Sequence, residues 1–256
     1  MSKLSVENQF LDFSDYGRPV AQWIANALKN TRATPVQVSV AFVISGLSAI
    51  ACMLTHHYWA AGIFLIVKSI LDAADGELAR VKKTPSYTGR YLDSNADIIL
   101  NALLLITICY ISNGSWLCTL LAFIGIQLQG TLYNYYYLIL RHSSAGGDTT
   151  SRIFETDAPI AMKGESQKTV DVLFAMYNFF YGYFDKIINK MDETAIKVRR
   201  LPNWFMSLIS LYGLGFQLLI MSIMLALDLA DYIIPFFIFY SFLLVVFIGI
   251  RRLFIA

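Results

Sequence analysis

The chain alternates long apolar stretches with short polar connections. Five apolar stretches stand out, covering residues 36–54, 98–111, 116–140, 204–227 and 232–250. A sixth stretch covers only residues 58–71. A helix needs roughly 20 residues to cross the hydrocarbon core of a membrane. If each stretch is a spanning helix, the sixth must therefore continue to about residue 80, and the stretch at 98–111 must begin earlier.

The two short stretches reach spanning length only by including aspartates. The first must continue through Asp72 and Asp75, and the second must begin before Asp93 and Asp97. At about 1.5 Å of helix rise per residue, both pairs of carboxylates lie just inside the same face of the membrane. Charged groups at this depth are costly and usually functional. They are therefore the first candidate site.

The composition supports a membrane environment. Of the 256 residues, 57% are hydrophobic, and the mean hydropathy is +0.55, which exceeds what a soluble core of this length would hold. The three cysteines lie in apolar stretches without the CxxC spacing of a metal site. The first ten residues have no apolar core, so we expect the first span itself to direct insertion. We expect no nucleic-acid partner.

Loops without basic residues alternate with loops that carry them. Lys and Arg are absent from three loops, at residues 55–58, 112–115 and 228–231. In contrast, Arg80 and Arg90 flank a basic loop next to the aspartates. The six apolar stretches predict an all-α, multi-pass integral membrane protein with six transmembrane helices. By the positive-inside rule, both termini and the aspartates are expected on the cytosolic side, and we expect a bacterial inner membrane.

Two further segments are expected on the cytosolic face. Apolar residues recur at helical spacing after Pro19, which predicts an N-terminal amphipathic helix on the membrane surface. The second is a long link at residues 142–200, whose aromatic run at 172–184 predicts an interfacial or packed helix. We thus divide the chain into a cytosolic segment at 1–33 and a six-helix domain at 34–256.

The aspartates recur at spacings that place them on single helix faces. Asp72 and Asp75 are three residues apart, and Asp93 and Asp97 are four apart. Pro85 lies between the two pairs and permits an antiparallel return of the chain. We therefore expect four carboxylates to face one another across one small gap.

Four neighbouring carboxylates near a bilayer need compensating charge. Carboxylate oxygens without nearby His or Cys suit Mg²⁺ or Mn²⁺, and a pair of such ions could hold a diphosphate. The alternative is that the aspartates are ordinary charged helix ends, neutralised by Arg80 and Arg90.

The region from Asp72 to Asp97 resembles the motif of a known family. The aspartates and the residues between them match the pattern DxxDGxxAR, eight residues, GxxxDxxxD of the CDP-alcohol phosphatidyltransferases. Thr34 and Pro35 also fit the start of that family's first helix, although Gln37 stands where the family usually has Asn. The link at 142–200 is longer than the family's usual link.

The resemblance implies roles for the motif residues. Asp72, Asp75, Asp93 and Asp97 would hold two divalent cations on the diphosphate of a CDP-linked donor, and Asp97 would also be the catalytic base. The small residues and the arginine would line the nucleotide and diphosphate site; these are Gly76, Ala79, Arg80 and Gly89. CMP would be the leaving group, and the family resemblance also suggests a homodimer.

Three basic residues are candidates for binding the acceptor, namely Lys68, Arg141 and Arg152. Each also has a simpler structural interpretation. Lys68 lies one helical turn before Asp72 and could pair with it, Arg141 could anchor a helix end, and Arg152 could be a solvated loop charge.

Three functions are consistent with the sequence. The first is a phospholipid synthase that transfers a phosphatidyl group from CDP-diacylglycerol to a small alcohol. The second transfers a phospho-alcohol from a small CDP-alcohol, of the CDP-choline or CDP-ethanolamine type, to a lipid hydroxyl. The third is a metal or solute carrier, which the scarcity of polar residues in the outer halves of the helices disfavours. The acceptor motifs do not distinguish the alcohols.

Overall fold

The computed structural model describes residues 8–143, 155–198 and 200–255, which are helical with short connections. Within these residues, no strand occurs. The α-helices are α1 (Arg18–Leu28), α2 (Pro35–Leu54), α3 (Tyr58–Lys82), α4 (Tyr87–Ile111), α5 (Trp116–Ser143), α6 (Gln167–Met191), α7 (Asn203–Ile209), α8 (Leu214–Ala226), α9 (Ala230–Tyr240) and α10 (Leu243–Phe254). The all-α prediction is confirmed.

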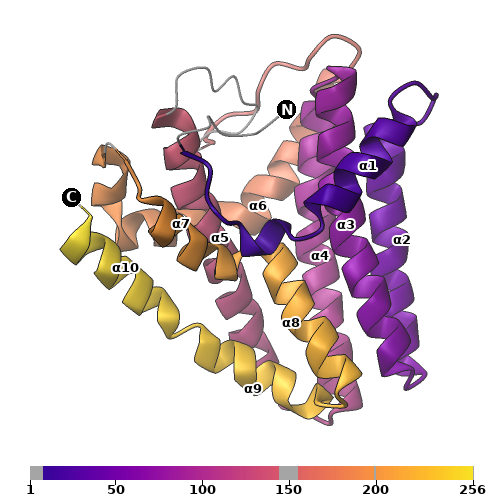
Figure 1. The fold of residues 1–256 in the computed structure, drawn as a ribbon, viewed down its shortest axis with the longest axis vertical. Helices are drawn as coiled ribbons and strands as arrows, with labels where there is room; N and C mark the ends of the chain where they lie inside the picture. The colour runs from indigo at the N-terminus through magenta and orange to yellow at the C-terminus, as the bar shows by residue number, and fades with distance from the viewer. Residues whose placement is uncertain (1–7, 144–154, 199, 256) are drawn as a thin grey trace.

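Helices α3 and α4 both pack on α2, and the three helices follow one another along the chain through short turns (Figure 1). Thr34 and Gln37 form a reciprocal capping box that starts α2, and Pro35 occupies its first turn. Helix α3 ends at Lys82, and the cap residue that follows, Lys83, has a left-handed φ of 55°. Ser86 caps α4 by accepting a hydrogen bond from the amide of Gly89. These local signals produce the antiparallel return that Pro85 predicted.

Both short apolar stretches are extended through the aspartates, as expected. Helix α3 continues beyond Asp75 to Lys82, and α4 begins six residues before Asp93. In consequence, the four aspartates lie near the ends of α3 and α4 that are joined by the 83–86 turn.

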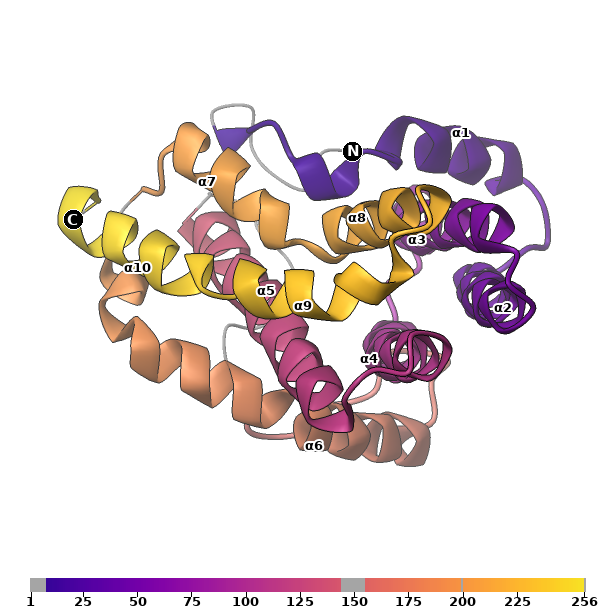
Figure 2. The same cartoon turned by 90° about the horizontal axis from the view of Figure 1, so that it is seen from below.

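Two helices lie across this set. Viewed along α2, α3 and α4, these three are seen end-on, whereas α1 and α6 are seen from the side (Figure 2). Helix α1 packs on α3, and α6 packs on α4 and α5. A helix thus occurs in each of the two segments, α1 at Arg18–Leu28 and α6 at Gln167–Met191. Their relation to a membrane surface stays a prediction.

Several helices are long and apolar enough to cross a membrane. Four candidates pass on length and hydropathy: Pro35–Leu54, Tyr87–Ile111, Trp116–His142 and Ala230–Phe254. The bent pair of Asn203–Tyr212 and Leu214–Ala226 would make a fifth. Helix α3 is not among them, and its first 18 residues include Lys68, Asp72 and Asp75. The chain therefore fits a multi-pass membrane protein, and a total of six spans stays a prediction.

The apolar stretch at 204–227 is not one straight helix. It bends by 51° at Gly213, between α7 and α8. The N-terminal segment packs at this bend so closely that a Cβ at Gly213 would lie 2.3 Å from Ser14 Cβ, and one at Gly215 would lie 1.9 Å from the Ser14 carbonyl oxygen. Glycine at both positions makes room for the N-terminal segment beside α8.

Candidate metal and nucleotide site

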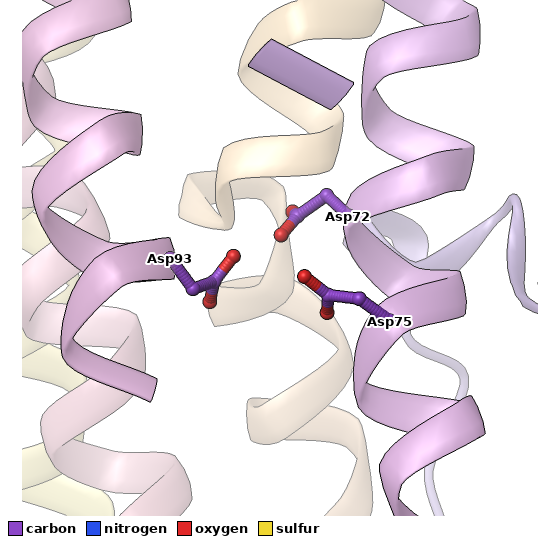
Figure 3. Close-up of side chains that lie close together, drawn as sticks. All are labelled: Asp72, Asp75 and Asp93. Atoms are coloured by element: carbon purple, nitrogen blue, oxygen red, sulfur yellow. The ribbon is translucent and has the colours of Figure 1, made fainter. Parts of the chain in front are cut away.

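Three carboxylates converge between α3 and α4. Asp72 and Asp75 project from α3 toward Asp93 on α4 (Figure 3), and each offers an oxygen within 4.8 Å of the other two. Asp75 is buried, and the other two are half-buried. Oδ1 of Asp93 is buried and accepts no hydrogen bond from the described residues. Such a cluster is strongly repulsive without a compensating cation.

The cluster fits a hard divalent cation. Its ligand atoms are all carboxylate oxygens, the type preferred by Mg²⁺ and Mn²⁺. The unsatisfied Oδ1 of Asp93 is a buried atom for which a cation would be a suitable partner. These two observations support Asp72, Asp75 and Asp93 as the residues that would hold metal.

Ser39 orients one of these carboxylates. Its hydroxyl donates a hydrogen bond to Oδ2 of Asp75, and Ser39 lies on the buried face of α2. This residue was not singled out from the sequence. The available signal was a hydroxyl within the apolar stretch at 36–54, but nothing local showed which carboxylate it would contact.

The fourth aspartate has a different partner. Asp97 is buried and forms an ion pair with the ammonium of Lys68, which is itself fully buried. The same ammonium lies 5.2 Å from the centre of the Phe42 ring on α2. Lys68 is therefore paired with Asp97 and not with Asp72, the partner that its spacing suggested. The expected group of four becomes a group of three next to an ion pair.

Arg80 is held close to the carboxylates by its own helix. Its guanidinium lies 2.8 Å from Glu77 Oε1, and a Cβ added to Gly76 would lie 3.5 Å from Arg80 Nη1. The guanidinium thus folds back over the bare backbone of Gly76, toward the turn that carries Asp75. The other two small motif residues, Ala79 on α3 and Gly89 on α4, are both half-buried. Glu77 was not predicted, because the family pattern leaves its position open.

The long link holds the start of α4. Glu165 accepts hydrogen bonds from the Ser86 hydroxyl at 2.7 Å and from the Thr88 amide at 2.7 Å. Burial raises the pKa of Glu165, but these hydrogen bonds outweigh burial and leave the pKa below its ordinary value of 4.5. Nearby, Glu155 pairs with Arg90 and accepts a hydrogen bond from the Tyr91 hydroxyl at 2.6 Å.

The link also lies beside the aspartates on α4. Tyr181 of α6 donates a hydrogen bond to the carbonyl oxygen of Ser94, 3.0 Å away, and Ser94 directly follows Asp93. Asn95 in turn donates to the carbonyl oxygen of Leu173 at 3.0 Å. No spacing in the sequence could have placed this helix, because its contacts with α4 join residues about 80 positions apart.

Of the three residues predicted to bind the acceptor, Arg141 and Lys68 lie within the described part of the chain. Arg141 lies in the last turn of α5, half-buried, and its Nε is buried without a hydrogen-bond partner in the described part of the chain. Its guanidinium also interacts electrostatically with the positive charges of Arg80 and Arg90. Lys68 is engaged by Asp97. Arg152 lies outside the described residues.

The geometry defines a class of protein: a helical chain that fits a multi-pass membrane protein, with a carboxylate cluster between two helices that is suited to a divalent cation. A family model described as CDP-alcohol phosphatidyltransferase matches residues 24–181, more than half of the chain. The chain therefore belongs to the CDP-alcohol phosphatidyltransferase family. All four aspartates lie within the matched region.

Some relatives carry a more specific name. CDP-diacylglycerol–serine O-phosphatidyltransferases of Mycobacterium bovis and Mycobacterium tuberculosis are each 30% identical to this chain over 110 residues. The match covers 41% of this chain and 38% of each relative. It therefore spans less than half the length of the relatives.

Proposed function

We propose that this protein is a membrane phospholipid synthase that transfers the phosphatidyl group of CDP-diacylglycerol to a small alcohol and releases CMP. The observation that carries the proposal is the convergence of Asp72, Asp75 and Asp93 between two helices of a protein of this family. A carboxylate cluster at this position suits a metal-bound diphosphate, which both candidate donors contain.

The proposed reaction exchanges one phosphorus–oxygen bond for another. The acceptor hydroxyl oxygen attacks the phosphatidyl phosphorus, the bond from that phosphorus to the bridging oxygen of CMP breaks, and the hydroxyl proton passes to Asp97. Divalent metal held by Asp72, Asp75 and Asp93 would neutralise negative charge on the diphosphate. Arg80, folded back over Gly76, would donate charge-assisted hydrogen bonds to a phosphate oxygen.

The side chains of Lys68 and Ser39 orient two of these carboxylates. The Lys68 ammonium holds one oxygen of Asp97, which fixes the orientation of the carboxylate and leaves its second oxygen to receive the proton. The Ser39 hydroxyl fixes Asp75 in the same way. Preorganisation of this kind lowers the cost of reaching the reactive geometry.

Serine is the acceptor that we favour. The mycobacterial relatives are named for it, and serine carries a carboxylate that a guanidinium can bind. Arg141 supplies a buried Nε without a partner in the described residues, near Arg80 and Arg90. We therefore propose Arg141 as the residue that recognises the acceptor's anionic group, with the alcohol entering from the cytosolic side.

The test is CMP release by purified protein in bilayer nanodiscs. CDP-diacylglycerol, CDP-choline and CDP-ethanolamine are supplied separately, the first with a panel of small alcohols that includes serine and glycerol 3-phosphate, and the other two with diacylglycerol. We expect CMP release from CDP-diacylglycerol with serine. Release only from CDP-choline or CDP-ethanolamine would support the second function in place of the first, and release from no donor would overturn both.

A further inference from the structure

Glu77 is a buried carboxylate that contacts two guanidiniums. Its side chain is 3% exposed. Its Oε1 lies 2.8 Å from Nη2 of Arg80 and 3.2 Å from Nη2 of Arg18. Arg80 belongs to the same helix, whereas Arg18 is the first residue of α1. One anion therefore joins the N-terminal helix to a motif arginine.

The N-terminal helix is packed tightly enough to hold Arg18 in place. Gly17, directly before it, is buried, and a Cβ there would lie 2.8 Å from Ile70 Cγ1 on α3. The guanidinium of Arg18 is also held from the other side, because its Nη1 lies 3.0 Å from Oδ2 of Asp15. Arg18 thus has a fixed position beside α3, with Asp15 on one side and Glu77 on the other.

The balance of charge around Glu77 determines how strongly Arg80 can attract a further anion. Glu77 alone with Arg80 would form a neutral pair, in which the guanidinium is largely compensated before a phosphate arrives. In the structure, two carboxylates alternate with two guanidiniums, in the order Asp15, Arg18, Glu77 and Arg80. Arg18 therefore compensates part of the Glu77 charge, although Asp15 also pairs with Arg18. Arg80 then keeps a net attraction for an anion, while Glu77 still fixes its direction over Gly76.

We propose that Arg18 is a positioning residue of the nucleotide site, which acts through Glu77 to leave the charge of Arg80 available to the diphosphate of the CDP-linked donor. The N-terminal helix is then part of the donor site, although it lies outside the motif. This inference rests on the proposed function, because it takes Arg80 as a ligand of the diphosphate.

The test measures the dissociation constant of CDP, the part that all candidate donors share, with full-length protein and Mg²⁺. Arg18→Met should weaken CDP binding about tenfold, as expected when a charge-assisted hydrogen bond loses strength. Arg18→Lys should bind nearly as the wild type does. The double variant Arg18→Met with Glu77→Gln should recover most of the loss, because a neutral Gln no longer compensates Arg80.

A matched control is Lys82→Met. Lys82 also joins α3 to the N-terminal region, through hydrogen bonds to the backbone carbonyl oxygens of Thr31 at 2.8 Å and Ala33 at 2.6 Å. Its loss should leave CDP binding within about twofold of the wild type, because its hydrogen bonds do not involve the Arg80 and Glu77 pair. Melting temperatures in detergent show whether each variant is folded.

Recovery of CDP binding in the double variant distinguishes an effect of charge balance from structural support of the fold by Arg18. A purely structural role of Arg18 predicts that the double variant binds CDP no better than Arg18→Met, and that result would overturn the proposal. Unchanged binding by Arg18→Met would overturn it too. If the wild type itself does not bind CDP, the proposed function fails first, which distinguishes the two failures.

Discussion

At the scale of single residues, the structure separates two tasks among four aspartates. Asp72, Asp75 and Asp93 share one small space, whereas Asp97 is paired with Lys68. Asp97→Asn should therefore lower turnover by about 10²- to 10⁴-fold, the range for loss of a general base, with little change in CDP binding. Asp93→Asn should weaken CDP binding as well as turnover.

Titrating CDP binding and CMP release at several Mg²⁺ concentrations distinguishes these cases. Excess Mg²⁺ should restore part of the activity of Asp93→Asn and almost none of that of Asp97→Asn. Equal rescue of both variants would show that Asp97 is a further metal ligand and that the base lies elsewhere.

The buried ion pair of Lys68 and Asp97 makes a separate prediction about stability. Removing one partner of such a pair leaves an uncompensated buried charge, so Lys68→Met should destabilise the protein by about 3–5 kcal/mol. The double variant Lys68→Met with Asp97→Asn should be more stable than Lys68→Met alone. Unfolding in detergent measures both, and a double variant less stable than the single would contradict the pairing.

At the scale of secondary-structure elements, Glu165 in the link caps the start of α4. Glu165 accepts hydrogen bonds at the start of that helix, so Glu165→Gln should cost about 1 kcal/mol, as for loss of a helix cap. Because the pKa of Glu165 is lowered in the folded protein, its contribution is present above the ordinary pKa and disappears as the pH falls through the folded pKa.

The pH dependence gives the measurement. The difference in melting temperature between wild type and Glu165→Gln should be largest near neutral pH and should vanish in acid. A difference that stays undiminished as the pH falls well below the ordinary Glu pKa of 4.5 would contradict the proposed cap. Lys168→Met, at an exposed position in the first turn of α6, is a control that alters a side-chain charge in the link.

The elements differ in how far the sequence could predict them. Helix α3 was predicted through Asp72 and Asp75 because a membrane fixes the minimum length of a helix. The bend at Gly213 was missed, because no local pattern marks it and the segment that packs there, at Ser14, lies about 200 residues away. The capping of α4 by Glu165 was missed for the same reason. Local sequence patterns were sufficient to predict the helices. Contacts between distant segments could not be predicted, because they have no periodic pattern in the sequence.

The site shows the same division. The motif spacing correctly placed Asp72, Asp75 and Asp93 together. It could not show that Lys68 would choose Asp97 over Asp72, because both partners were within reach of a lysine side chain. Nor could it show that Glu77 would join Arg80 to α1, since that contact depends on how α1 packs against α3.

At the scale of the whole molecule, the distribution of basic residues predicts which side of the membrane holds the site. After replacement of the three native cysteines by alanine, a cysteine at Asn113 should react with a membrane-impermeant reagent added outside intact cells. One at Ser86 should react only after the membrane is opened. Labelling of Ser86→Cys from outside would place the site on the wrong face for cytosolic nucleotides.

The central claim is that transfer depends on metal held by the carboxylates between α3 and α4, and chelation tests it most directly. Purified protein is washed with EDTA, supplied with CDP-diacylglycerol and serine, and assayed for CMP release before and after metal is added. The account predicts no release in excess EDTA and restored release with Mg²⁺ or Mn²⁺, but no restoration in Asp72→Asn at the same concentration. Full release in excess EDTA would contradict it.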